Sequence, residues 1–145
     1  MKTLITLISI ATVAVLAPDA MSSERAARST VTAHSSRFGQ VLFDGRGFAL
    51  YGFTKDPRGR SVCRGACAAA WPPYIVRGAP RAAAGVKGSL LGTTRRPDGR
   101  LQVTYAGKPL YYYVGDRAPR QILCQNVFEF GGLWLVVRPS GTLVR

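Results

Sequence analysis

Hydrophobic residues recur at every second position in two stretches of the chain, and each stretch ends at a turn signal. From residue 101 to 105, Leu, Val and Tyr alternate with Gln and Thr before Ala106-Gly107, which is typical of a half-buried β-strand and a tight turn. Residues 41 to 43 precede Asp44-Gly45 in a comparable way, and residues 48 to 53 provide a return strand. The pattern therefore predicts two β-hairpins.

The segments that follow the two turns are copies of one another. LYGFTKD spans residues 50–56 and LYYYVGD spans residues 110–116. Trp71 and Trp134 also align when three residues are inserted into the second copy, and we interpret them as core residues, one per repeat. An aromatic groove for a ligand is the alternative for these tryptophans. The aligned motif pairs are Tyr51 with Tyr111, Phe53 with Tyr113, and Asp56 with Asp116.

The aromatic residues of each motif are expected to face the core. Tyr51 and Phe53 lie two positions apart, as do Tyr111 and Tyr113, so each pair lies on one side of its strand. Tyr112 is predicted to point to the opposite side.

Two roles are open for the motif aspartates. Asp56 begins DPRG, the signature of a type I turn, so we favour a carboxylate that accepts backbone N–H bonds and ends the strand. Asp116 is expected to act similarly. Alternatively, pseudo-symmetry brings Asp56 and Asp116 together as an acid/base pair.

The remaining segments complete a mostly β domain. Residues 61–71 are rich in alanine and stop at Pro72-Pro73, which predicts one short helix that contains two cysteines. We expect two pseudo-symmetric hairpin repeats, at about 39–76 and 98–141, to form a small barrel or a two-sheet sandwich around one core.

The N-terminus has the features of an export signal. Lys2 precedes an uncharged, apolar stretch from Thr3 to Ala17, which is shorter than the roughly 20 residues of a membrane span. We predict a signal peptide at 1–20, cleaved after Ala20 or, alternatively, after Ala17. A retained N-terminal anchor is the third interpretation.

The segment after the apolar stretch is polar and without period. Residues 21–37 are therefore predicted to be a disordered linker that precedes a single domain at 38–145. No cysteine lies near the end of the apolar stretch, so a lipid anchor is doubtful.

The chain carries a formal net charge of +13. Such an excess favours anionic partners, and for an exported protein these are phospholipid headgroups or cell-wall polymers. Solubility is an equally good reason for so many arginines. The arginines are spread through turns and form no basic stripe within a nucleic-acid-binding module, so nucleic acid is not expected as a partner. No specific protein partner is identifiable.

Cys63, Cys67 and Cys124 are the cysteines of the chain. Nearby cysteines of exported proteins usually oxidise, and a Cys63–Cys67 disulfide is expected, with Cys124 buried and inert, free, or paired with one of the others. The C-x3-C spacing differs from the C-x2-C of catalytic redox pairs. Because His34 is the only histidine, the sequence predicts no metal site, no cofactor and no Ser/His or Cys/His catalytic residues.

Longer segments around the repeats resemble a known family. These segments are CRGACAAAWPP at 63–73, DGRLQVTYAGKPLYYYVGD at 98–116 and GGLWLVVRPSG at 131–141. With the two Tyr-x-aromatic-x-x-Asp motifs, they are similar to the secreted-repeat proteins of bacterial envelopes, which include predicted lipoproteins. The resemblance covers about residues 39–141 and implies an exported bacterial protein with a tandem repeat, a Cys63–Cys67 disulfide and no established biochemical role. The chain departs from the family in its missing lipid-attachment cysteine and in Cys124.

These features together predict an exported, non-catalytic protein of the cell envelope whose cationic surface binds anionic envelope components. A small-ligand or redox-accessory protein that uses the tyrosine-rich strands and Cys124 is the main alternative. An enzyme built on Asp56 and Asp116 is the third.

Overall fold

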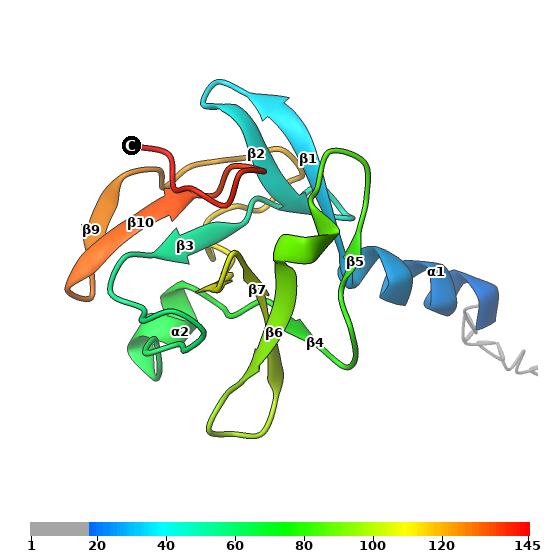
Figure 1. Cartoon of the computed structure of the whole chain (residues 1–145), viewed down its shortest axis with the longest axis horizontal. Helices are drawn as coiled ribbons and strands as arrows, with labels where there is room; N and C mark the ends of the chain where they lie inside the picture. Colours follow the sequence, from blue (N-terminus) through cyan, green and yellow to red (C-terminus); the bar gives the residue numbers. More distant parts are fainter. Residues whose placement is uncertain (1–17) are drawn as a thin grey trace, which may run out of the picture.

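Short β-strands make up most of the fold, which is described for residues 18–145 by a computed structural model. Figure 1 shows the strands gathered into one body, with α1 projecting from the start of β1. This confirms the predicted mostly β class. The elements in chain order are α1 Pro18–Arg28, β1 Thr30–Ser36, β2 Gly39–Asp44, β3 Tyr51–Phe53, α2 Ala66–Ala70, β4 Ile75–Val76, β5 Arg81–Ala82, the 3₁₀-helix η1 Gly88–Leu90, β6 Leu91–Arg95, β7 Leu101–Tyr105, β8 Lys108–Pro109, β9 Val127–Glu129 and β10 Gly132–Val136.

The strands form three small sheets. Their orders are β2-β1-β5, β3-β10-β9 and β4-β7-β6, and β8 also pairs with β7. Every pairing is antiparallel except that of β1 with β5. The sheet β3-β10-β9 joins β3 of the first repeat to β9 and β10 of the second, so the two repeats share one sheet.

Each repeat contains an antiparallel hairpin followed by a short strand. The hairpins are β1–β2 and β6–β7. The predicted return strand at 48–53 is divided in the structure: Ala49 bridges back to Phe43, whereas β3 leaves the hairpin and pairs with β10. The predicted turn at Ala106-Gly107 leads into β8, and both turn residues have positive φ.

The prediction of a disordered linker at 21–37 differs from the structure. This segment contains most of α1 and all of β1, and β1 pairs with β2 from Val31–Asp44 to Ser36–Gly39. This strand could not be predicted from a hydrophobic pattern because its side chains are mostly small and polar, and it is held by backbone pairing with β2. The first repeat therefore begins several residues before the predicted position 39.

The helix predicted at 61–71 is shorter than expected. Only residues 66–70 form α2, and Gly65 precedes it with a positive φ of 56°. Residues 75–88, which follow Pro72-Pro73, contain the short strands β4 and β5.

Two clusters of buried residues form the core. Tyr51 and Tyr111 belong to the first cluster, and both side chains are fully buried. Tyr112 packs on the second cluster, where its ring lies 5.2 Å from that of Tyr74. Tyr112 therefore points away from its neighbour Tyr111, as predicted, but towards a second core and not towards solvent.

The predicted signal peptide at 1–20 lies outside the described residues except for its last three positions. Within residues 18–145, no helix is both long and apolar enough to cross a membrane.

Candidate functional site

The two repeats meet at a backbone bridge between their motif tyrosines. The amide of Tyr51 donates to the carbonyl of Tyr111 at 2.9 Å, and the amide of Tyr111 donates back to the carbonyl of Tyr51 at 2.9 Å. Directly opposed residues of an antiparallel pair carry their side chains on the same face. The bridge therefore places two equivalent tyrosines side by side at the junction of the repeats.

Each motif tyrosine donates a hydrogen bond to the aspartate of the other repeat. The Tyr51 hydroxyl donates to Asp116 Oδ2 at 2.7 Å, and the Tyr111 hydroxyl donates to Asp56 Oδ2 at 2.6 Å. We call these two bonds the tyrosine–aspartate exchange. They explain why tyrosine and aspartate recur together in both copies, since each motif supplies one donor and one acceptor to the other.

The second oxygen of each carboxylate accepts a backbone N–H. Asp56 Oδ1 accepts from the amide of Val62 at 2.7 Å, and Asp116 Oδ1 accepts from the amide of Leu123 at 3.0 Å. The aspartates thus bind backbone amides, as the structural interpretation predicted, but in the loops beyond their turns. The tyrosine partners were missed, because sequence spacing does not show contacts between repeats.

Burial raises the pKa of both aspartates above its ordinary value. For Asp56 the bonds from Tyr111 and Val62 and the nearby charge of Arg96 oppose this rise in pKa. For Asp116 only the hydrogen bonds oppose it. Burial, together with the neighbouring carboxylates, also raises the pKa of both tyrosines, so the tyrosines stay protonated and act as hydrogen-bond donors.

Aromatic rings stack across the repeats next to the exchange. The rings of Trp71 and Trp134 are nearly parallel, with centroids 4.1 Å apart, and Phe53 lies on Trp134 at 4.1 Å. Tyr113 lies against Trp71 at 4.8 Å. Trp134 therefore contacts Phe53 of the first repeat, and Trp71 contacts Tyr113 of the second. These aromatic contacts cross between the repeats in the same way as the tyrosine–aspartate hydrogen bonds.

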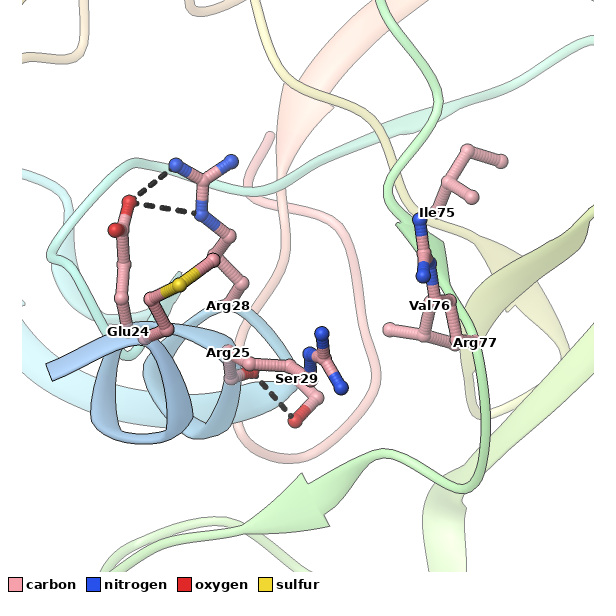
Figure 2. Close-up of a pocket in the computed structure, with 8 residues that line it drawn as sticks. Glu24, Arg25, Arg28, Ser29, Ile75, Val76 and Arg77 are labelled. Carbon is pink, nitrogen blue, oxygen red and sulfur yellow. Dashed lines mark hydrogen bonds and ion pairs between the residues drawn. The ribbon is translucent and has the colours of Figure 1, made fainter. Parts of the chain in front are cut away.

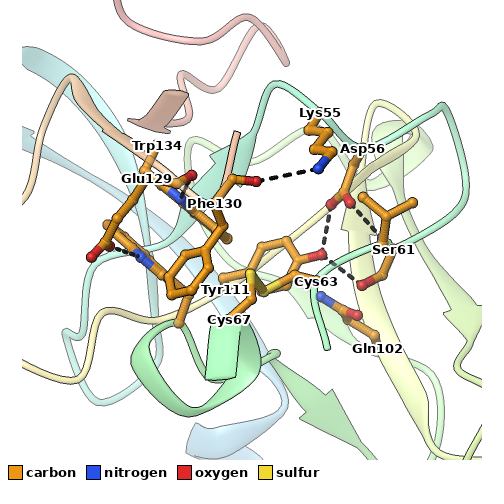
Figure 3. Close-up of a disulfide and its surroundings, with 12 residues drawn as sticks. Lys55, Asp56, Ser61, Cys63, Cys67, Gln102, Tyr111, Glu129, Phe130 and Trp134 are labelled. Carbon is orange, nitrogen blue, oxygen red and sulfur yellow. Dashed lines mark hydrogen bonds between the residues drawn. A yellow bond between two sulfur atoms is a disulfide. The ribbon is translucent and has the colours of Figure 1, made fainter. Parts of the chain in front are cut away.

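The tryptophans also contact their own repeats and share one polar partner. Tyr51 meets Trp71 edge-on at 5.2 Å, and Tyr111 meets Trp134 edge-on at 5.1 Å. Both indole N–H groups donate to Glu129: Trp71 to its carboxylate at 2.8 Å and Trp134 to its backbone carbonyl at 3.2 Å. Figure 3 shows Glu129 and Trp134 on one side of Tyr111 and Asp56 on the other.

A buried arginine lies behind Tyr111. Arg96 donates to Ser61 Oγ at 2.7 Å, to Gln102 Oε1 at 2.8 Å and to the carbonyl of Cys63 at 2.8 Å. Ser61 Oγ also lies within hydrogen-bond distance of the Tyr111 hydroxyl, at 2.7 Å. The sequence did not predict this network, because Gln102 occupies the strand face expected to be exposed, and β7 is in fact buried on both faces.

Asp44 has a larger role than the predicted turn signal. Its side chain is fully buried and accepts from the Arg46 guanidinium at 2.8 Å and 2.9 Å. The Tyr112 hydroxyl donates to the same carboxylate oxygen at 3.1 Å. This carboxylate therefore joins the first hairpin to the second motif.

The predicted disulfide between Cys63 and Cys67 is present, with Cα atoms 5.3 Å apart, and Cys124 is a half-buried free thiol.

His34 lies on β1, with its ring 5.9 Å from that of Phe43. Among residues 18–145, no three His, Cys, Asp or Glu side chains form a group that could hold a metal ion.

Removing the disulfide is expected to lower the free energy of unfolding by about 2 kcal/mol, because the closed loop is short and constrains few residues of the unfolded chain. The Cys63→Ser/Cys67→Ser variant tests this in urea. Cys124→Ser is the control and should change stability by less than about 1 kcal/mol. Intact mass after alkylation without reduction should show one modified thiol. Three modified thiols, or equal losses in both variants, would contradict the assignment.

The geometry defines a class of protein, a tandem-repeat β protein in which each repeat completes the hydrogen bonds of the other. A family model described as a secreted repeat of unknown function matches residues 32–74 and 92–138, more than half of the chain. The chain belongs to this family, and the resemblance noted from the sequence is confirmed. The family description identifies an exported protein. No curated protein and no solved structure matches the chain.

Proposed function

We propose that this exported protein is a non-catalytic component of the cell envelope that binds anionic envelope surfaces through its cationic exterior. The observation that carries the proposal is the distribution of charge between surface and interior. Within residues 18–145, fifteen of the nineteen Lys and Arg side chains are exposed, whereas only four of the seven Asp and Glu side chains are.

The buried acids account for this difference. Asp44 and Asp116 are buried and Asp56 is half-buried, and all three accept hydrogen bonds inside the fold. Two exposed acids, Glu24 and Asp98, are paired with arginines. Exposed basic side chains therefore outnumber exposed acidic ones by fifteen to four, which supports attraction to anionic polymers and lipids.

The state of the motif residues supports a non-catalytic role. Asp56 and Asp116 each accept from a different tyrosine and a different amide, and no hydrogen bond joins one carboxylate to the other in the described part of the chain. Tyr51 and Tyr111 are buried, and their hydroxyls are bonded. The arrangement favours a scaffold over both the acid/base pair and the ligand-binding tyrosine strands.

Sedimentation with lipid vesicles tests the proposal. The protein is expected to bind vesicles that contain phosphatidylglycerol, and raising the salt from about 50 mM to about 500 mM should weaken binding at least about tenfold, since salt screens exposed charges. Phosphatidylcholine vesicles are the control and should bind little protein. Equal binding to both vesicles, or binding that salt does not change, would contradict the proposal.

A further inference from the structure

A cavity of about 340 Å³ lies between the last turns of α1 and the strand β4. Arg25 and Arg28 line it from the helix, and Arg77 lines it from the segment that follows β4. Figure 2 shows Arg25 and Arg28 on one side of the cavity and Arg77 on the other. Ile75 and Met21 contribute apolar surface to the same cavity. It therefore combines three cations with an apolar wall.

The cations of the cavity exceed its acids. Glu24 is the one acidic residue among the lining side chains, and it pairs with Arg28, whose Nε donates to it at 3.1 Å. This contact lowers the pKa of Glu24. Among residues 18–145, the side chains of Arg25 and Arg77 form neither a hydrogen bond nor an ion pair. Two guanidinium groups in the cavity therefore keep their donors available.

The two walls are held together by backbone contacts. The amide of Arg81 donates to the carbonyl of Ser29 at 2.8 Å, and Thr30 is paired with Arg81 in the β1–β5 ladder. The last carbonyls of α1 would repel an anion, but those of Arg25, Ala26 and Ala27 already accept hydrogen bonds within the protein. The Ser29 hydroxyl donates to the carbonyl of Arg25, and the Thr30 hydroxyl donates to that of Ala26 at 2.7 Å.

We propose that this cavity binds the phosphate group of an envelope component, which gives the proposed surface attraction a defined site and rests on that proposed function. A guanidinium presents paired N–H donors that match two phosphate oxygens. Arg25 and Arg77 donate hydrogen bonds to the phosphate from opposite walls. Ile75 and Met21 contact the organic part of a phosphate ester. Arg28 joins them when the phosphate displaces Glu24.

Titration of the ¹⁵N-labelled full chain with inorganic phosphate tests the site. Phosphate should shift the amide signals of α1 and of residues 75–77. The Arg25→Gln/Arg77→Gln variant should bind phosphate at least about tenfold more weakly, a loss of about 1.4 kcal/mol. The matched control, Arg64→Gln/Arg117→Gln, removes two exposed arginines elsewhere and should bind within about twofold of the wild type. Equal weakening in both variants, or no phosphate binding by the wild type, would overturn the site.

Glu24→Gln provides a test in the opposite direction. Because Glu24 competes with phosphate for Arg28, removing its charge should strengthen phosphate binding about two- to fivefold. Weaker binding in this variant would overturn the arrangement.

Vesicle binding distinguishes a lipid phosphate from a soluble one. It also distinguishes failure of the proposed site from failure of the proposed surface binding. If phosphatidic acid in phosphatidylcholine vesicles binds at the site, inorganic phosphate should compete with it and the Arg25→Gln/Arg77→Gln variant should lose it. If inorganic phosphate binds and such vesicles do not, the site takes a soluble phosphate and the surface proposal fails alone. If both arginine variants bind vesicles equally and with the same salt sensitivity, and also bind inorganic phosphate equally, the surface proposal stands and the site is overturned.

Discussion

Replacing Trp134 with alanine is expected to lower the free energy of unfolding by about 3–5 kcal/mol. The indole is fully buried and stacks on Trp71 and Phe53 at 4.1 Å each, so its removal leaves a cavity at the junction of the two repeats. Both repeats lose packing at once, because these two neighbours belong to the first copy and Trp134 to the second. Urea unfolding followed by circular dichroism measures the loss.

Phe128→Ala is the matched control for this prediction. Phe128 is also an aromatic residue of the β9–β10 hairpin, but its side chain is 70% exposed. Its replacement should change stability by no more than about 0.5 kcal/mol. A loss below about 1 kcal/mol for Trp134→Ala, or equal losses for both variants, would show that the stack does not hold the repeats together.

The Tyr51→Phe and Tyr111→Phe variants should each lower the free energy of unfolding by about 1.5–3 kcal/mol, because each leaves a buried or half-buried carboxylate without its hydroxyl donor. The two bonds of the exchange are 2.7 Å and 2.6 Å long. A double-mutant cycle of Tyr51→Phe with Asp116→Asn isolates the first bond. Tyr113→Phe removes the same oxygen from a half-buried ring that bonds neither motif aspartate, and it should cost less than about 1 kcal/mol. A coupling energy near zero would contradict the exchange.

The exchange also predicts how stability depends on pH. Because the folded state raises the pKa of Asp56 and Asp116, it holds their protons more tightly than the unfolded chain does. Their contribution to stability is therefore greatest below the ordinary aspartate pKa and is lost as the pH rises through the folded pKa. Tyr51→Phe removes a bond that lowers the pKa of Asp116. The loss of stability with rising pH should therefore extend to higher pH in the variant than in the wild type. Urea unfolding across the acidic range measures both curves. Parallel curves for wild type and variant would argue against the coupling.

Parts of the fold that depend on local pattern could be predicted from the sequence. The turn at Ala106-Gly107 and the opposite directions of Tyr111 and Tyr112 follow from period two and turn chemistry. The Cys63–Cys67 disulfide followed from close spacing in an exported chain.

Features that depend on pairing between distant segments could not be predicted. β1 has no hydrophobic pattern and is defined by its backbone bonds to β2. β3 leaves its hairpin to pair with β10, and Tyr51 also bridges to Tyr111, which places Tyr51 next to Asp116. Arg96 and Gln102 look like surface residues in the sequence, because nothing local shows that β7 is covered on both sides.

The tyrosine–aspartate exchange has a consequence for the origin of the chain. In each repeat, the tyrosine donates to an aspartate of the other repeat, and the aspartate accepts from a tyrosine of the other repeat. A two-fold symmetric homodimer of single repeats would satisfy both groups, because each subunit would supply what the other lacks. Duplication and fusion of its gene would turn that subunit interface into the interior of one polypeptide, and assembly would no longer depend on concentration.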